Sequence, residues 1–456
     1  MKSGKLFVTL HTMTQLPAAF TDYTRQLMGE ERFGRYLQSF EQETPVSIRL
    51  NPRKTGGQWQ VAADHEAVPW CRGGYYLTRR PNFTMDPLLH AGCYYVQEAA
   101  SMFLDEVLRQ LHDAYVSHQP SALSHQPSAF SLQPSTLSPQ PSTLSHQPSA
   151  FRPLSALDLC AAPGGKSTLL RAALPADCVL YSNEPMRQRA SVLLENVTKW
   201  GYPHHLVTNC YPKDYRKAKL KFDLILCDVP CSGEGMFRKD EATIREWSEQ
   251  NVEKCWRLQR DIVDDAWHCL NEGGILIYST CTFNTKENEE NIRYFLQQYD
   301  DMEVVDIAIK PEWHITGSLL EGFTEPVYRF IPGTTRSEGL FMCVLRKKGS
   351  LPPRPLQKER ELKRVLEPPF LLEGDGERLN LPYQQAIAYL RHEALTLPPD
   401  TPRGVVTVCF QGHALGPVKN IGSRANNLYP KEWKIKTTHI PNDYEAILRH
   451  TEPHTD

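Results

Sequence analysis

Between residues 154 and 345, short apolar runs alternate with amphipathic stretches, and this alternation constrains the fold of the 456-residue chain more than any other feature. Short runs rich in β-branched and aliphatic residues are typical of buried parallel strands. The alternation predicts an α/β fold with a doubly wound parallel sheet. The predicted strands are 154–160, 178–182, 205–209, 222–228, 275–280 and 340–345, and the predicted helices run from the turn after the first strand to 174, over 186–200, from about 251 to 270, and over 287–298.

Three further segments divide the rest of the chain. Residues 118–152 hold five copies of a seven-residue unit close to His-Gln-Pro-Ser-Ala-Leu-Ser, and the proline in each copy forbids a continuous helix. We predict a disordered Gln/Pro/Ser insertion over 116–152, because added length in a surface loop costs only about 0.6 kcal/mol per doubling. A proline-rich stretch then predicts a linker over 349–365. The predicted domains are an α/β region at 1–90, the domain with the doubly wound sheet at 91–348 and a third at 366–456.

Composition excludes several classes of protein. No stretch approaches the roughly 20 apolar residues that a membrane span needs, and the first residues lack the apolar core of a signal peptide. A chain with 40% hydrophobic and 23% charged residues is typical of globular proteins in water. Its 12 cysteines follow no regular spacing, which favours reduced thiols in the cytoplasm over a disulfide framework. The net charge of −2 neither indicates nor excludes a nucleic-acid partner.

A turn with two glycines joins the first predicted strand to its helix. Residues 158–166 read Asp-Leu-Cys-Ala-Ala-Pro-Gly-Gly-Lys, and glycines at a helix N-terminus let a ligand approach free backbone N–H groups. The glycine spacing matches neither the dinucleotide fingerprint nor the Walker pattern. Glu184 ends the next strand, where an acid can accept both hydroxyls of a ribose. A nucleoside site without a pyrophosphate loop predicts S-adenosylmethionine, although each feature alone also fits a plain turn or a helix-capping acid.

Two cysteines stand just past the ends of predicted strands. Cys231 follows strand 222–228, and Cys281 follows strand 275–280. Open α/β sheets bind their ligands in the crevice at the carboxyl ends of the strands, so the two thiols predict sulfur chemistry on a ligand held between them. A metal pair is disfavoured, because neither cysteine belongs to a Cys-x-x-Cys motif or a nearby set of histidines. The usual alternative for a cysteine is a buried structural role, which we expect for Cys160, Cys178 and Cys227.

Four motifs, in this order along the chain, resemble those of the Nol1/Nop2/Sun RNA (cytosine-5)-methyltransferases. They are Tyr-Tyr-Val-Gln-Glu-Ala-Ala-Ser at 94–101, the turn at 158–166, Asp-Val-Pro-Cys-Ser-Gly at 228–233 and Ser-Thr-Cys at 279–281. Residues 234–240 resemble the bacterial branch that contains the F-type enzymes of 16S rRNA. The resemblance runs from about residue 16 to residue 348. It implies a Rossmann-like class I methyltransferase sheet, an N-terminal RNA-binding region and a C-terminal PUA-like β-rich domain.

The resemblance also assigns the catalytic residues. It implies that Cys281 adds to carbon 6 of cytosine, which makes carbon 5 nucleophilic, and that Cys231 assists release of the methylated base. Asp228 would orient the base or the methionine end of the cofactor, and Lys166 would reach the same pocket. The family's acid for the adenine edge is missing here, and Asn209 is the candidate in its place. The predicted cofactor contacts are Cys160, Ala161, Ala162, Pro163, Gly164, Gly165, Lys166, Glu184, Asn209 and Asp228.

Residues 417–436 resemble the PUA-like RNA-binding tail of the same branch. The cations at Lys419, Arg424 and Lys431 interleave with Tyr429 and Trp433, which fits phosphate contacts combined with base stacking. The alternative is a solvated basic face around a small core, and the residues alone do not choose between the two.

The predicted function is therefore methyl transfer from S-adenosylmethionine to carbon 5 of cytidine in RNA, with rRNA of the small ribosomal subunit or its precursor as the expected partner. We expect a cytoplasmic monomer without a metal. Three alternatives stay open: a tRNA methyltransferase, a non-catalytic RNA-binding ribosome assembly factor, and a thiol oxidoreductase that uses the two cysteines as a disulfide pair.

Overall fold

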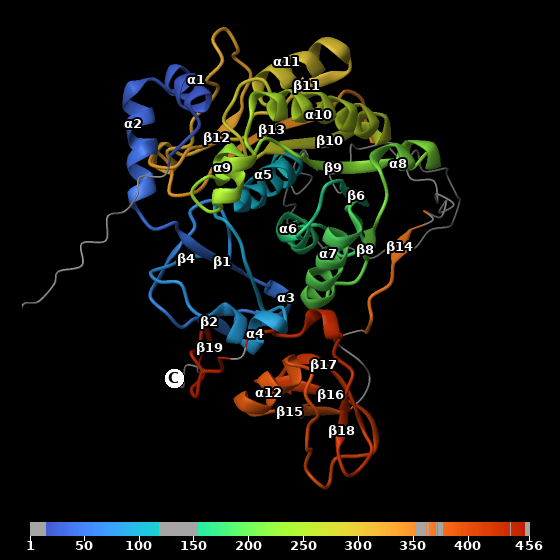
Figure 1. Cartoon of the computed structure of the whole chain (residues 1–456). Helices are drawn as coiled ribbons and strands as arrows, with labels where there is room; N and C mark the ends of the chain where they lie inside the picture. Colours follow the sequence, from blue (N-terminus) through green and yellow to red (C-terminus); the bar gives the residue numbers. More distant parts are fainter. Residues whose placement is uncertain are drawn as a thin grey trace, which may run out of the picture.

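The computed structural model of the chain describes residues 15–117, 154–351, 362, 364–370, 372, 377–437 and 439–451 (Figure 1). The predicted insertion at 116–152 lies outside these ranges except for its first two residues, and most of the predicted linker at 349–365 lies outside them as well. Within the described ranges, no helix is both long enough and apolar enough to cross a membrane.

A central sheet runs in the order β11-β13-β10-β9-β6-β7-β8-β14, with β12 paired to β13. Five neighbouring strands pair in parallel, so the predicted doubly wound α/β fold is confirmed. These five are β6 (Ser155–Asp158), β7 (Val179–Asn183), β8 (His205–Thr208), β9 (Phe222–Asp228) and β10 (Leu270–Thr280). The strands at the two edges are β11 (Met302–Val304), β12 (Tyr328–Phe330), β13 (Leu340–Lys347) and β14 (Val365–Leu366).

Strand β13 corrects one expectation, because it runs antiparallel to β10 instead of continuing the parallel sheet. An antiparallel edge strand on an otherwise parallel sheet is common in α/β folds. The strand order reverses between β6 and β9, since the chain proceeds outward through β7 and β8 and then returns to the other side of β6. The carboxyl ends of β6 and β9 therefore open onto the crevice where such folds bind ligands.

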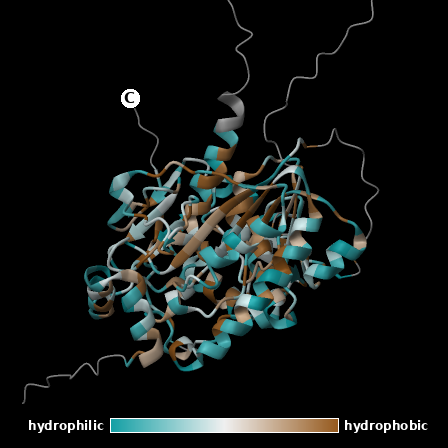
Figure 2. Ribbon diagram, turned by 90° about the horizontal axis from the view of Figure 1, so that it is seen from above, coloured by the Kyte–Doolittle hydropathy of each residue, from teal (hydrophilic) through white to brown (hydrophobic). Residues whose placement is uncertain are grey.

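Alternate residues of the strands face two helical layers. Leu224 and Leu226 of β9 pack in the apolar cluster that includes residues of α5 and α6, whereas Ile225 packs in the cluster that includes residues of α8, α10 and α11. Figure 2 shows the hydrophobic strands between more hydrophilic helices. The helices of this domain are α5 (Phe103–Ser117), α6 (Gly165–Ala173), α7 (Arg187–Trp200), α8 (Pro212–Ala218), α9 (Glu241–Glu246), α10 (Glu249–Cys269) and α11 (Glu289–Gln298).

The end of α10 and the start of β10 differ from the bounds predicted for this helix, about 251 to 270, and for the following strand, 275–280. The helix ends at Cys269, and Leu270 is already extended, with φ −83° and ψ 135°. Leu270 pairs with Phe222 of β9, and the register then shifts before Ile275. Residues 271–274 therefore form an irregularity within β10, because burial of Leu270 in the core starts the strand before the glycines.

The N-terminal region forms helices and a small sheet beside the central domain. Its sheet has the order β3-β4-β1-β5. The boundary predicted at residue 90 falls inside this sheet, because β5 pairs with β1. The bounds are α1 (Ala18–Met28), α2 (Glu30–Gln38), β1 (Val46–Leu50), α3 (Pro52–Thr55), β2 (Trp59–Val61), β3 (His65–Ala67), β4 (Gly74–Leu77), α4 (Pro87–His90) and β5 (Tyr94–Val96).

The C-terminal domain is β-rich and packs against the N-terminal region, below α4 in Figure 1. Its sheet has the order β15-β16-β17-β18. Leu88 and Tyr94 of the N-terminal region share one apolar cluster with Leu390 and Leu415 of this domain. Near the chain end, β19 (Leu448–His450) pairs with β2. The other elements are β15 (Arg378–Asn380), α12 (Tyr383–Leu390), β16 (Gly404–Phe410), β17 (His413–Asn420) and β18 (Ala425–Asn427).

Candidate active site

The turn between β6 and α6 forms one wall of the site. Gly164 caps α6 with φ +117°, a left-handed conformation that favours glycine. Asp158 at the end of β6 accepts a hydrogen bond from Ser167 Oγ at 2.5 Å, while its second oxygen is buried without a protein partner among the described residues. Burial raises the pKa of Asp158 to about 7, and the nearby carboxylate of Asp228 adds to this effect. A polar group of a ligand can satisfy the free oxygen.

Lys166, Asp228 and Ser279 form a hydrogen-bonded group at the centre of the site. The Lys166 ammonium lies 2.9 Å from one oxygen of Asp228, and the hydroxyl of Ser279 donates to the other at 2.6 Å. Burial opposes the charge on Lys166, but Asp228 outweighs it, so the pKa of Lys166 is raised. Lys166 therefore stays charged, and Asp228 is held in one orientation from both sides.

The two cysteines meet at the carboxyl ends of neighbouring strands. Cys231 and Cys281 are free thiols, and their sulfur atoms lie 3.1 Å apart. The backbone N–H of Cys281 also donates to the sulfur of Cys231 at 3.3 Å. The hydrogen bond to Cys281 and burial raise the pKa of Cys231 well above its ordinary value. Both effects favour the protonated form of Cys231, and either sulfur can donate in the contact between the two thiols.

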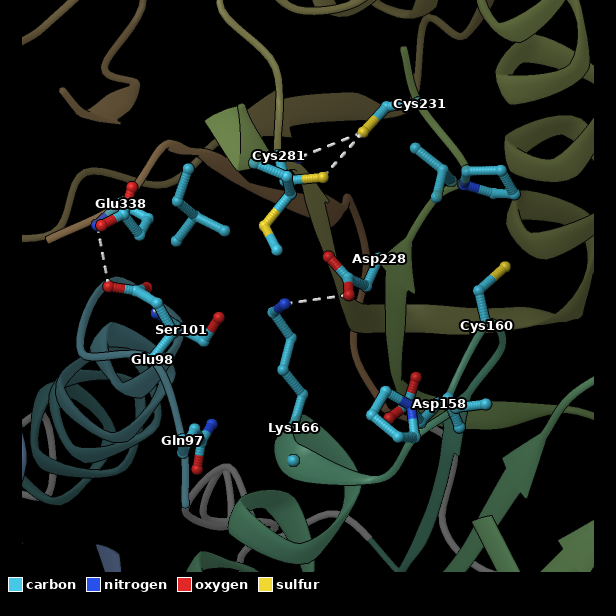
Figure 3. A pocket seen from close by; sticks show the side chains of 18 of the residues that line it. Gln97, Glu98, Ser101, Asp158, Cys160, Lys166, Asp228, Cys231, Cys281 and Glu338 are labelled. Carbon is cyan, nitrogen blue, oxygen red and sulfur yellow. Dashed lines mark hydrogen bonds and ion pairs between the residues drawn. The ribbon is translucent and has the colours of Figure 1, made fainter. Parts of the chain in front are cut away.

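A cavity of about 410 Å³ joins these groups (Figure 3). In the close-up, Lys166 points from α6 toward Asp228, and the two sulfur atoms lie on the far side of Asp228 from Lys166. Of the predicted site residues, those that line this cavity are Cys160, Ala161, Ala162, Pro163, Gly165, Lys166, Asp228, Cys231 and Cys281. Both thiols therefore line the same cavity as the turn at 158–166.

Three predicted site residues, Gly164, Glu184 and Asn209, are not among the residues that line this cavity. Gly164 shapes the turn through its backbone. Glu184 is 1% exposed: it accepts a hydrogen bond from the backbone of Met186 at the start of α7 and pairs with Arg189 at 3.1 Å. Asn209 donates its amide to the backbone oxygens of Glu184 and Pro185 at 2.7 and 2.9 Å. The N-cap residue of α7 is Met186, and no side-chain hydrogen bond caps this helix within the described residues, so the capping role weighed for Glu184 is not present. Cofactor contacts by Glu184 and Asn209 stay predictions.

Arg189 was not predicted as a site residue. It lines the cavity and donates to the carbonyl of Ala162 at 2.9 Å, so it bridges the turn and Glu184. No motif marks it in the sequence. A ligand hydroxyl that reaches Glu184 has to share this carboxylate with Arg189 or displace it.

The opposite wall comes from segments that the strand pattern did not connect with the site. Tyr95, Gln97, Glu98 and Ser101 line the cavity from the N-terminal side, and residues 338–340 line it next to the cysteines. Glu98 joins these two segments, because it accepts from the backbone of Glu338 at 2.9 Å. The motif at 94–101 was the available signal, but it carried no assigned role.

Two buried carboxylates, also missed, hold the loops behind the cysteines. Glu287 accepts from the backbone of Ser232 at 3.0 Å, and Glu234 accepts from the backbone of Phe283 at 2.8 Å. The amide of Asn284 donates to both, at 2.8 and 3.0 Å. Burial raises the pKa of Glu287 to about 7. The loops that carry Cys231 and Cys281 are thus tied to one buried polar network.

The predicted RNA-binding residues of the C-terminal domain divide into two groups. Lys419, Arg424 and Lys431 are exposed, as phosphate contacts require. Tyr429 and Trp433 are only 2% and 8% exposed and belong to the cluster shared with the N-terminal region. The expectation that these two rings stack on bases is wrong for this conformation, because both rings are packed in the core.

The part of the chain that the structure describes contains no group of three or more His, Cys, Asp or Glu side chains that could hold a metal ion.

The sheet order and the pocket at its switch point define a Rossmann-like methyltransferase fold. Residues 144–346 match the family described as 16S rRNA methyltransferase RsmB/F, residues 16–99 match the N-terminal domain of 16S rRNA methyltransferase RsmF, and residues 377–435 match the methyltransferase RsmF PUA domain. The chain belongs to the RsmB/F family of methyltransferases, with N-terminal and PUA domains of the RsmF type.

Similar proteins carry related names. Ribosomal RNA small subunit methyltransferase F from Pectobacterium atrosepticum is 31% identical over 366 residues, which cover 75% of this chain and 65% of that protein. The protein of the same name from Aliivibrio fischeri strain MJ11 is 28% identical, over 76% of this chain and 68% of its own length. The chain thus spans about 65% of the length of the first relatives it matches.

Solved structures show the same fold. A methyltransferase homolog protein from Pyrococcus horikoshii matches with a TM-score of 0.51 and 23% identity, over 73% of this chain and 100% of its own. NSun6 from Pyrococcus horikoshii, solved with SFG, matches with a TM-score of 0.53 and 17% identity, over 74% of this chain and 100% of its own.

Proposed function

We propose that this protein transfers a methyl group from S-adenosylmethionine to carbon 5 of a cytidine in rRNA of the small ribosomal subunit. The observation that carries the proposal is the pair of thiols, 3.1 Å apart, at the carboxyl ends of β9 and β10, in the same cavity as the glycine turn. The relatives named small subunit methyltransferase F support the choice of rRNA.

The residues of the turn fit S-adenosylmethionine. Among the described residues, one buried oxygen of Asp158 has no partner, and the left-handed Gly164 brings backbone close to the cavity. Lys166 with Asp228 lies between this turn and the thiols. When bound, the cofactor supplies a methyl group activated by a sulfonium. The turn at 160–165 would hold its nucleoside part, and Glu184 would accept its ribose hydroxyls once Arg189 shares or leaves that carboxylate.

The roles of the thiols follow from their positions. Cys281 adds through sulfur to carbon 6 of cytosine, and the ring electrons then make carbon 5 a nucleophile. The charged Lys166 interacts with Cys281 and stabilises negative charge on its sulfur. After methyl transfer, a water molecule accepts the proton of carbon 5, the electrons of that C–H bond re-form the double bond between carbons 5 and 6, and the electron pair of the sulfur–carbon bond returns to Cys281. Cys231 assists this release, since its sulfur touches that of Cys281.

Asp228 orients the groups that meet at the thiols. Lys166 and Ser279 fix both of its oxygens, so its acceptor positions are set before a ligand arrives. The carboxylate can accept from the exocyclic amine of cytosine or contact the methionine end of the cofactor. Because a paired base is out of reach inside a helix, the target has to be flipped out or already unpaired.

The test is methyl incorporation from labelled S-adenosylmethionine into 16S rRNA by the purified protein. We expect no incorporation with Cys281→Ala, and a protein–RNA adduct that survives a denaturing gel with Cys231→Ala. Cys409→Ala, which removes a buried thiol from the C-terminal domain, is the matched control and should methylate without a trapped adduct. An adduct with Cys281→Ala and none with Cys231→Ala would reverse the two roles. Bisulfite mapping of rRNA and tRNA then identifies the modified cytidine.

The contact between the two sulfur atoms also fits a dithiol that cycles through a disulfide. The raised pKa of Cys231 disfavours Cys231 as the attacking thiolate in thiol–disulfide exchange. Methyl transfer that persists in strong reductant supports the methyltransferase and excludes a required disulfide.

A further inference from the structure

A second cavity, of about 440 Å³, adjoins the one that holds the thiols. The two cavities share Val96, Gln97 and Glu98 as a common wall. The second cavity is otherwise lined by residues 44–47 at the start of β1, by Arg80 after β4, and by Arg238 and Lys239. It is therefore a groove between the N-terminal region and the catalytic domain that shares one wall with the cavity of the thiols.

The groove presents positive charge to solvent. Arg80 and Lys239 are exposed, and neither forms an ion pair within the described ranges. The guanidinium of Arg80 rests over the ring of Phe83, with 5.5 Å to the ring centre, which restricts where its charge can lie. Among the described residues of the lining, Glu98 is the one carboxylate, and it accepts hydrogen bonds from the backbone N–H groups of Ser101 and Glu338.

Arg238 has a different task in the same groove. Its side chain is 5% exposed and lies 3.0 Å from the carboxylate of Glu338, and it donates to the backbone oxygen of Gln42 at 3.3 Å. Arg238 thus anchors the loop after η4 (Glu234–Met236) to the N-terminal region. This anchor leaves Arg80 and Lys239 as the two cations available to a ligand.

One loop links the groove to the thiols. Cys231 lies before η4 and Lys239 lies after it, so the segment that holds the release thiol also holds a cation of the groove. A nucleotide flipped into the thiol cavity stays attached to its own strand, so the phosphates beside it have to lie at the mouth of that cavity. Cations that contact phosphates set the register of a strand without reading its sequence.

We infer that this groove binds the sugar-phosphate backbone of single-stranded RNA next to the target cytidine, with Arg80 and Lys239 as the phosphate contacts. The inference rests on the proposed function for the identity of the base in the adjoining cavity. A volume of 440 Å³ lies in the range of ligand sites and accommodates part of a chain, not a whole duplex.

Salt dependence of RNA binding tests the inference independently of catalysis. The probe is a short fluorescent single-stranded RNA with one cytidine, titrated over a series of salt concentrations. Each phosphate contact contributes about 0.7 to the slope of log K against log salt, which is about fivefold in affinity between 1 M and 0.1 M. The double variant Arg80→Gln/Lys239→Gln should lower the slope by about 1.4 and weaken binding about 25-fold at 0.1 M.

The control Lys213→Gln/Lys217→Gln removes two exposed charges from α8, none of whose residues lines either cavity, and should leave the slope unchanged. Binding of S-adenosylmethionine, measured by calorimetry, should be equal in all variants. A wild-type slope in the groove variant would overturn the inference, whether or not the wild-type protein methylates RNA. If the wild-type protein methylates no RNA but the groove variant shows a lower salt slope, the proposed function is wrong and the inference that the groove binds RNA stands.

The competing explanation is that the groove binds free phosphate and not the backbone of RNA. RNA binding measured with and without inorganic phosphate, at matched ionic strength, distinguishes the two. If the groove binds free phosphate, inorganic phosphate weakens RNA binding more than a salt of the same ionic strength does. If the groove variant no longer shows this extra effect but keeps the wild-type salt slope, the groove binds the free anion and the inference is wrong.

Discussion

Gly235 lies where three backbone segments meet beside the proposed nucleophile, and its replacement by alanine is the sharpest test of how Cys281 is positioned. Its N–H donates to the carbonyl of Cys281 at 2.9 Å, and its own carbonyl accepts from Gly339 at 3.2 Å. A methyl group at Gly235 would lie 2.7 Å from the Cα of Gly339 and 2.9 Å from the carbonyl oxygen of Cys281. Carbon atoms in contact normally keep about 3.5–4.0 Å, so the backbone has to move by about 1 Å.

No flexible side chain can absorb this movement, because the atoms met first belong to the backbone. Misplacement by about 1 Å costs about 100-fold in rate, or about 2.7 kcal/mol of transition-state stabilisation. Overpacking costs a further ~1–3 kcal/mol of folding stability. We expect Gly235→Ala to fold, to bind S-adenosylmethionine with unchanged affinity, and to lose about 100-fold in kcat/KM for RNA methylation.

Gly317→Ala is the matched control, since Gly317 is exposed and a methyl group there meets no atom of the described residues within 4 Å. This variant should keep full activity and stability. Full activity of Gly235→Ala in a folded protein would refute the argument, because it would mean that Cys281 tolerates displacement of the backbone that carries it.

Three further predictions concern the groups around the thiols. Ser279→Ala removes the hydroxyl that donates to Asp228, which should lower kcat more than it raises KM for S-adenosylmethionine and cost about 1 kcal/mol of stability; unchanged kcat would show that Asp228 needs no fixed orientation. Asn284→Ala leaves Glu234 and Glu287 without their shared donor and should cost about 1–3 kcal/mol for each, measured by urea unfolding. A loss under 1 kcal/mol would contradict the bridging role. Burial raises the pKa of the Glu287 carboxyl from 4.5 to about 7 in the folded state. The contribution of this group to folding stability is therefore present at low pH and is lost as the pH rises through about 7. Glu287→Gln lacks this titration, so its stability relative to wild type should increase between about pH 5 and pH 8, and a constant difference would show that Glu287 is ionised throughout.

The local sequence was sufficient to predict an element where all residues of the segment favour the same secondary structure. The strand predicted at 222–228 is β9 with the same bounds, because its apolar run is bounded by the polar residue that opens the crevice. The turn at 158–166 and the cysteines past two strand ends meet in one cavity, since parallel strands place their carboxyl ends on the same edge.

Contacts between distant segments could not be inferred in this way. The direction of β13, the pairing of β5 with β1 and of β19 with β2, and the burial of Tyr429 and Trp433 depend on which surfaces meet after folding. The periodicity of a segment reports which of its own faces is apolar, but not the partner that covers it. The tertiary structure alone therefore decided that the N-terminal and C-terminal regions share a core.

The features of the candidate site also divide into those that the sequence predicts and those that only tertiary packing creates. The residue types along the chain determined the thiol pair, the glycine turn and the lysine that faces Asp228, because each stands at the end of a strand or the start of a helix. Packing alone decided the wall formed by residues 95–101, the bridge of Asn284 between two buried carboxylates and the cationic groove. The wall needs groups more than 100 residues apart to lie within hydrogen-bond distance, and only the folded chain brings Glu98 to Glu338.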